Sequence, residues 1–211
     1  DEAREKQNAE SVSIIVMEPR DSSIHALANT GRYNLNEPRK KPDDVDEAVW
    51  DEASDEDRNQ ILFDKWRNNA ISDSYEPGSV YKVINLAAGL EEGKLNDNMS
   101  FSCSGSIDVY GRTLSCADHT AHGTQDISKA LNNSCNVAFV QIGNILGKND
   151  ILRYAKAFGF GEKSGVDLPG ESLGILPTNI NAIGPVELAT MSYGHGLAVT
   201  PIQMANAICA V

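Results

Sequence analysis

Ser79-Val80-Tyr81-Lys82, which follows Glu76-Pro77-Gly78, carries more structural information than any other part of this 211-residue chain. Glycine and proline interrupt the preceding structure, so a helix is predicted to begin here. Three positions apart on a helix, Ser79 and Lys82 lie on one face. A serine hydroxyl needs a base within hydrogen-bond reach to act as a nucleophile, and a buried lysine loses its proton more easily than a solvated one. The pattern predicts Ser79 as the nucleophile and Lys82 as its base.

A second motif, Ser134-Cys135-Asn136, follows later in the chain. S-x-x-K alone recurs by chance, but S-x-x-K with a later Ser-x-Asn triplet is a signature of penicillin-binding proteins and class A β-lactamases. Ser134 and Asn136 are two positions apart, so both can reach one cleft from a loop or a helix start. Cys135 is expected to point into the core, where a buried cysteine usually behaves as a small hydrophobe.

Longer blocks of sequence resemble class B penicillin-binding proteins, the monofunctional peptidoglycan transpeptidases. The resemblance runs from about Val12 to the last residue, with the blocks in the family's order. Besides the two motifs, the similar blocks are 67–79, 158–161 with 165–171, 192–196 and 199–205. Within the family the chain is most similar to division-type enzymes and to the stage V sporulation protein D branch, and we favour the sporulation branch.

The resemblance implies the α+β penicillin-recognising serine transpeptidase fold, an antiparallel sheet flanked by helices. The hydrophobic pattern and the order of the predicted elements agree with this α+β fold. The predicted elements are a hairpin at 11–17 and 24–28, helices at 79–90, 134–146, 150–158 and 186–192, and another helix starting at Pro201. The family's third motif, usually Lys-Thr-Gly on a later strand, does not occur before Val211. We therefore expect the C-terminal strands to be missing from this chain. Residues 1–10 are expected to end a linker from a pedestal domain, and 11–211 to form the incomplete transpeptidase domain.

The net charge of −12 argues against a nucleic-acid partner. An acidic insertion at 43–57 holds nine acidic residues and no basic one, and so accounts for most of this charge. Charge runs are usually solvated, although Val49 and Trp50 suggest that part of the insertion forms a short amphipathic helix. No apolar run approaches the roughly 20 residues that would span a bilayer.

The resemblance implies a serine D,D-transpeptidase that cross-links peptidoglycan stem peptides ending in D-Ala-D-Ala. Ser79 would form the acyl-enzyme, Ser134 would shuttle the proton toward the leaving group, and Asn136 would bind the substrate amide. β-Lactams would acylate the same serine. The family also implies a membrane anchor outside this chain, an extracytoplasmic catalytic domain and a membrane glycosyltransferase partner. The alternatives are a β-lactam sensor and a non-catalytic scaffold of the same fold.

A cluster of metal-binding residue types lies just ahead of the second motif. Thiolate and imidazole groups are the ligands that zinc prefers in structural tetrahedral sites. We favour a structural zinc ion held by the two cysteines and one or both histidines, with the aspartate as the alternative ligand. A disulfide between the two cysteines and simple packing remain as alternatives. The residues are Cys103, Cys116, Asp118, His119 and His122.

Overall fold

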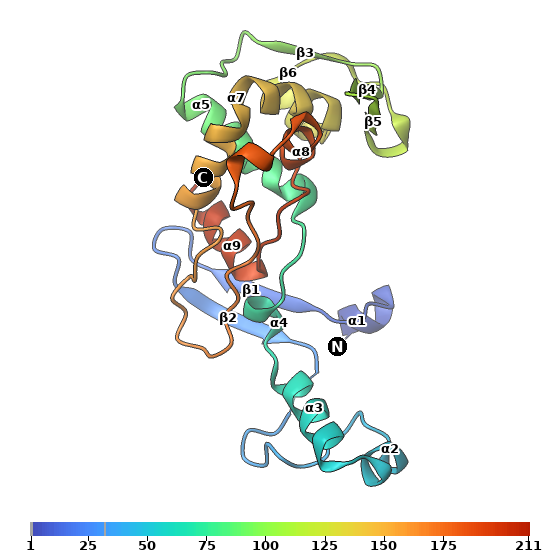
Figure 1. Ribbon diagram of the computed structural model, residues 1–211. Helices are drawn as coiled ribbons and strands as arrows, with labels where there is room; N and C mark the ends of the chain where they lie inside the picture. The colour runs from blue at the N-terminus through green and yellow to red at the C-terminus, as the bar shows by residue number, and fades with distance from the viewer. Residues whose placement is uncertain (1, 32) are drawn as a thin grey trace.

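The computed structural model describes residues 2–31 and 33–211, which form three regions along one long axis (Figure 1). A helical body lies at one end, a two-stranded hairpin in the middle and a small helical lobe at the other end. The helices are α1 (Glu2–Gln7), α2 (Glu47–Glu52), α3 (Asp55–Trp66), α4 (Asn69–Ser72), α5 (Lys82–Glu91), α6 (Ile127–Asn132), α7 (Asn136–Ala157), α8 (Pro185–Met191) and α9 (Pro201–Cys209), with 3-10 turns η1 (Gly78–Tyr81), η2 (Ala117–His119) and η3 (Ile180–Ala182). The strands are β1 (Ser13–Met17), β2 (Ile24–Asn29), β3 (Ser100–Cys103), β4 (Ser106–Val109), β5 (Arg112–Ser115) and β6 (Gly123–Asp126).

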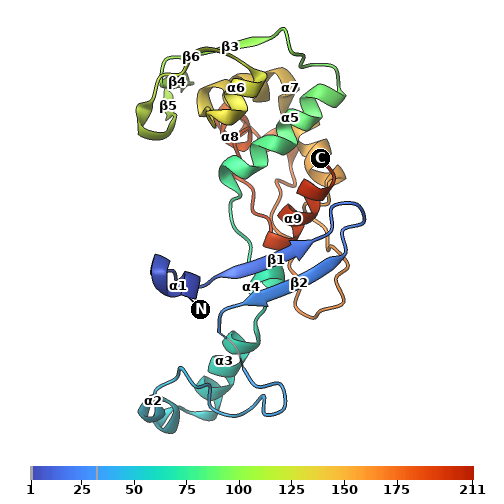
Figure 2. The ribbon, with the colours of Figure 1, turned by 180° about the vertical axis from the view of Figure 1, so that it is seen from behind.

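The strands of the described residues form three separate antiparallel pairs, β1–β2, β3–β6 and β4–β5. The predicted N-terminal hairpin is confirmed, with Ile15 opposite Leu27. Residues alternate along β1, so Ile15 and Met17 pack against the buried Ile202 of α9, while Ile14 and Val16 on the other face are exposed. Seen from behind, α9 lies directly against this hairpin (Figure 2). Helices and small antiparallel sheets together confirm the α+β class.

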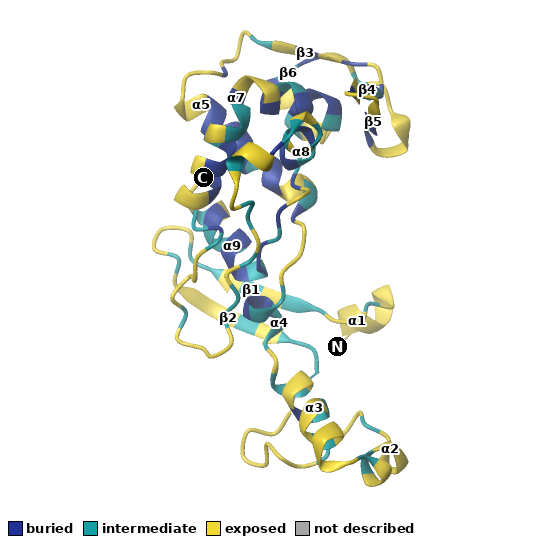
Figure 3. Cartoon of the chain, viewed as in Figure 1, coloured by how far each residue is buried: buried dark blue, intermediate teal, exposed yellow. Residues whose placement is uncertain are grey.

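The helical body holds the main hydrophobic core (Figure 3). Helices α5 and α7 pack against each other, and Ile84, Phe139 and Ile142 between them are fully buried. The sequence predicts two helices at 134–146 and 150–158. The structure joins them into α7, with a break at Gly147, whose φ of 76° lies in the left-handed region that glycine tolerates. Predicted helix starts at 186 and Pro201 are confirmed to within one residue in α8 and α9.

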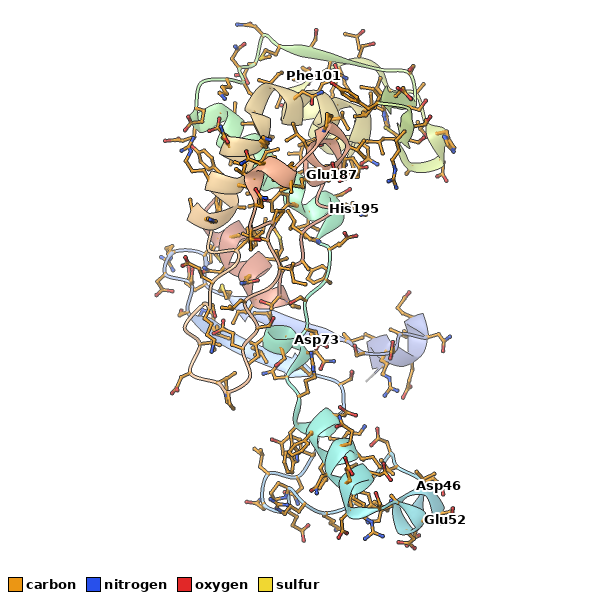
Figure 4. The ribbon with its side chains drawn as sticks, in the orientation of Figure 1. Asp46, Glu52, Asp73, Phe101, Glu187 and His195 are labelled. Atoms are coloured by element: carbon orange, nitrogen blue, oxygen red, sulfur yellow. The ribbon has the colours of Figure 1, made fainter. Side chains whose placement is uncertain are left out.

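The acidic insertion at 43–57 contributes α2 and the first turn of α3 to a projecting lobe, and the labelled Asp46 and Glu52 lie at its far end (Figure 4). Local polar contacts build it: Asp46 caps α2 by accepting from the N–H of Ala48, and Ser54 caps α3. The short helix predicted to contain Val49 and Trp50 is confirmed as α2, although Val49 is exposed. No helix among the described residues is both long and apolar enough to cross a membrane.

Candidate active site and thiol cluster

Ser79 lies in the 3-10 turn η1, directly before α5. The predicted helix start is therefore tighter than an α-helix for its first turn. Ser79 is exposed, whereas Lys82, the first residue of α5, is fully buried. The Nζ atom of Lys82 lies 3.2 Å from the Oγ atom of Ser79. An accessible nucleophile is thus in hydrogen-bond contact with a buried amine.

The second motif also contacts Lys82. Lys82 Nζ lies 3.0 Å from Ser134 Oγ, 2.7 Å from the Ser134 carbonyl oxygen and 2.7 Å from Asn136 Oδ1. The structure therefore brings together all four residues that the sequence assigns to the reaction. Burial lowers the pKa of Lys82 to about 8. A lysine with this pKa is partly neutral near physiological pH and can accept a proton.

Backbone geometry places the second motif. Ser134 has a φ of 47°, an uncommon conformation for a residue with a side chain. This conformation accompanies the contact of both its hydroxyl and its carbonyl with Lys82. Helix α7 then begins at Asn136, and the Cys135 Sγ atom caps it by accepting from the N–H of Ala138. Asn136 also donates its Nδ2 hydrogen to the carbonyl of Ser115 at the end of β5, at 2.9 Å.

Four side chains of metal-binding types lie close to one another, and one of them belongs to the second motif. We call them the thiol cluster, because three are thiols: Cys103, Cys116 and Cys135, with His122 as the fourth member. Their ligand atoms all lie within 4.8 Å of one another. The Sγ atoms of Cys103 and Cys116 are 3.7 Å apart, as are those of Cys116 and Cys135, and Cys103 Sγ lies 3.5 Å from His122 Nδ1. The three thiols are buried and His122 is half-buried.

The residues that the structure brings together differ in two ways from the metal ligands expected from the sequence. Asp118 and His119 are exposed and outside the thiol cluster. Both have φ values above 50°, so the chain turns through two consecutive left-handed residues between Cys116 and His122. Cys135, expected only to pack in the core, is indeed fully buried but is also a cluster member. Its proximity depends on how β5 meets the start of α7, which local spacing does not reveal.

Backbone N–H groups also point at the cluster sulfurs. The N–H groups of Gly105 and Ala138 donate to Cys103 and Cys135, each at 3.4 Å. Burial alone would raise the pKa of Cys103, but hydrogen bonds from His122 and Gly105 lower it to about 6. Burial instead raises the pKa of Cys135 well above its usual value. The cluster therefore holds one thiol that ionises readily and one that resists ionisation.

Residues 12–211 match the family model for the penicillin-binding protein transpeptidase domain. Because this match covers nearly the whole chain, the chain belongs to the penicillin-binding protein transpeptidase family. Stage V sporulation protein D of Bacillus subtilis (strain 168) is 36% identical over 211 residues, which are all of this chain and 30% of that protein. The peptidoglycan D,D-transpeptidase MrdA of Acinetobacter baumannii is 29% identical over 205 residues, covering 92% of this chain and 29% of its own length.

Solved structures agree with the fold. The transpeptidase domain of penicillin-binding protein 3 from Burkholderia pseudomallei superposes with a TM-score of 0.78 at 21% identity, covering 99% of this chain and 52% of that one. A peptidoglycan glycosyltransferase from Burkholderia ambifaria gives the same TM-score at 22% identity, covering 99% and 55%. The chain thus has the fold that the sequence resemblance implies, and it spans under a third of the length of both curated relatives described above.

Proposed function

We propose that this chain carries the acylation site of a peptidoglycan D,D-transpeptidase. One observation carries the proposal: the buried Lys82 amine contacts Ser79 Oγ and both polar side chains of the second motif. Burial that lowers the pKa of Lys82 to about 8 supports its role as the base. The family to which the chain belongs supports the choice of substrate.

In the proposed reaction, the neutral amine of Lys82 accepts the Ser79 hydroxyl proton while Ser79 Oγ bonds to the carbonyl carbon of the penultimate D-alanine. The C–N bond to the terminal D-alanine breaks, and the leaving amine takes a proton relayed from Lys82 through Ser134. An amine from a neighbouring stem peptide then attacks the ester and gives a proton to the same base. Ser79 departs with a proton, leaving one new amide cross-link.

The test is covalent labelling of the intact protein with a penicillin, followed by peptide mass spectrometry. The adduct is expected on Ser79 and is expected to disappear in Ser79→Ala. Lys82→Ala should slow labelling by about 100-fold or more, the range for loss of a general base. An adduct on Ser134, or undiminished labelling of Ser79→Ala, contradicts the assignment.

Two other functions are possible for this fold, a β-lactam sensor and a non-catalytic scaffold. The long blocks at 67–79 and 192–205 favour the enzyme. Turnover separates the three: an enzyme releases D-alanine repeatedly from a D-Ala-D-Ala donor, a sensor keeps its acyl group, and a scaffold needs no acylation for its effect. One equivalent or less of D-alanine released per protein would exclude the transpeptidase.

The proposed setting follows the family. The substrates are stem peptides ending in D-Ala-D-Ala, β-lactams compete for Ser79, and the domain acts outside the cell membrane with a membrane glycosyltransferase as partner. The 36% identity to stage V sporulation protein D supports a role in sporulation rather than division. Deletion of the gene should then impair spore formation and leave growth and division unchanged. Filamentous growth of the deletion strain would favour division instead.

We further propose that the thiol cluster binds one structural zinc ion through Cys103, Cys116, Cys135 and His122. Zinc in a tetrahedral site has Zn–S bonds of about 2.3 Å and Zn–N bonds of about 2.0–2.1 Å, which place sulfur atoms about 3.8 Å apart and sulfur and nitrogen about 3.5 Å apart. Three separations within the cluster, two between sulfur atoms at 3.7 Å and one between sulfur and nitrogen at 3.5 Å, fit these edges. The N–H groups that donate to the cluster sulfurs support the same assignment, since metal ligands are commonly held by such secondary hydrogen bonds.

Four protein ligands would leave no open position, so the ion would hold the second motif in place and would not activate water. The test is the metal content of protein purified without added zinc, with about one equivalent expected. Protein with under about a tenth of an equivalent, and with Cys103 and Cys116 recovered as a disulfide, would support the oxidised alternative instead.

A further inference from the structure

The chain leading to Ser79 runs beside a second segment, 194–199, and is joined to it by backbone hydrogen bonds. Tyr75 and Val199 exchange two of them, at 3.0 and 2.9 Å. One step closer to the nucleophile, the N–H of Gly78 donates to the carbonyl of Gly194 at 3.0 Å. No side chain caps η1, so the Gly194 carbonyl is the group that holds the N–H preceding Ser79.

The two segments lie so close together at Gly78 and Gly194 that position 194 has no space for a side chain. A Cβ atom on Gly194 would lie 2.1 Å from the carbonyl oxygen of Gly78, and Gly194 has a φ of 87°. The position of Ser79 therefore depends on the exact path of the turn at 194–196. A shift of this turn moves the carbonyl that fixes Gly78, and with it the Ser79 hydroxyl relative to Lys82.

Glu76, three residues before the nucleophile Ser79, also binds this turn. Its Oε1 atom accepts from the N–H of Gly196 at 2.8 Å, and its Oε2 atom lies 3.0 Å from His195 Nδ1. The hydrogen bond from Gly196 holds the pKa of the Glu76 carboxyl below its ordinary value. In Figure 4, His195 lies beside the turn that begins α5. Glu76 and Gly78, which flank Pro77, thus both hydrogen-bond to the same turn at 194–196.

We propose that Glu76 is a positioning residue for acylation: its carboxylate holds the 194–196 turn, and this turn holds Ser79 in register with Lys82. The inference rests on the proposed acyl-enzyme function of Ser79. It assigns Glu76 no contact with the substrate. Its removal is therefore expected to slow bond formation without weakening the initial, noncovalent binding of the ligand, because small displacements of reacting groups affect the chemical step.

The experiment compares Glu76→Ala, Glu76→Gln and the surface control Glu91→Ala in the intact protein. A fluorescent penicillin separates the noncovalent dissociation constant from the acylation rate constant. Glu76→Ala should lower the rate constant by about 10- to 100-fold with an unchanged dissociation constant. Glu76→Gln should stay within about threefold of wild type, because glutamine keeps an acceptor for Gly196. Hydrogen exchange at the Gly196 amide should be faster in Glu76→Ala alone.

Three kinetic results would overturn the inference. These are an unchanged acylation rate in Glu76→Ala, a defect confined to the dissociation constant, and a glutamine variant as slow as the alanine variant. The second would mark Glu76 as a ligand contact, and the third would show that its charge matters more than its hydrogen bond. Wild-type protein that does not label at all would instead refute the proposed function, so the two failures are distinguishable. Slow exchange of Gly196 in Glu76→Ala would also contradict the role, whatever the activity.

Discussion

Asn136 links the base to the β4–β5 hairpin. Its Oδ1 atom lies 2.7 Å from Lys82 Nζ, and its Nδ2 atom donates to the carbonyl of Ser115, next to Cys116 in the chain. One amide thus contacts the active site with one end and the strand leading into the thiol cluster with the other.

Asn136→Asp should disrupt this arrangement through charge. A carboxylate beside Lys82 favours the protonated amine, so the pKa of Lys82 rises and less neutral base is present at pH 7. The aspartate also cannot donate to Ser115. We expect acylation at least about 10-fold slower than in wild type at pH 7, as measured by stopped-flow labelling with a penicillin. Asn98→Asp, which adds the same charge at an exposed position, should label at the wild-type rate; equal rates for both variants would refute the role of Asn136.

The acylation rate of the wild-type protein should rise with pH. Burial lowers the pKa of Lys82 to about 8, so the fraction of neutral amine grows as pH increases toward and past this value. The rate should climb about tenfold per pH unit well below the pKa and level off above it. Labelling kinetics between pH 6 and 9.5 measure this profile. A rate independent of pH across this range would show that Lys82 is not the base.

Cys135→Ser should release the proposed metal, whereas Cys209→Ser should not. Cys135 lies in the thiol cluster and Cys209 lies in α9 outside it. Loss of one ligand from a structural zinc site removes binding energy that also stabilises the fold. We therefore expect lower zinc content and a lower Tm in Cys135→Ser alone. The same Tm and metal content in both variants would contradict a role for Cys135 as a ligand.

Thr200→Ala should destabilise the protein. Thr200 is fully buried and forms a capping box with Gln203 at the start of α9, the helix that packs on the β1–β2 hairpin. Loss of such a cap typically costs about 1 kcal/mol, and Thr200→Ser should recover most of it. Chemical denaturation of all three proteins measures the difference. An alanine variant as stable as wild type would show that packing, rather than the cap, sets the start of α9.

Local pattern was enough to predict much of this structure. Periodicity and Gly/Pro signals placed the N-terminal hairpin and the starts of α8 and α9, because those features depend on neighbouring residues. The pairing of Ser79 with Lys82 followed from helical spacing, and the partnership with Ser134 and Asn136 came from a recognised motif. The first turn at Ser79 is nevertheless 3-10, a difference too small for sequence spacing to reveal.

Longer-range contacts were harder to anticipate. Cys135 was assigned to the core because a lone buried cysteine is usually a packing residue, and its contact with Cys116 arises only when β5 meets α7. The presence of a third cysteine within the second motif was the available signal. Glu76 stands out in the sequence only as part of the predicted helix start and of the similar block 67–79; its contacts could not be predicted, because Gly196 and His195 lie about 120 positions away.

The projecting α2–α3 lobe has a consequence for how the molecule orients. Nine acidic residues fall within 43–57, so most of the net charge of −12 sits at one end of a long axis. A charge distribution of this kind gives the molecule a large electric dipole. Near an anionic surface, such as a bilayer rich in acidic lipids, repulsion turns the lobe outward. At physiological salt this repulsion acts only within the screening distance of about 8 Å from the surface.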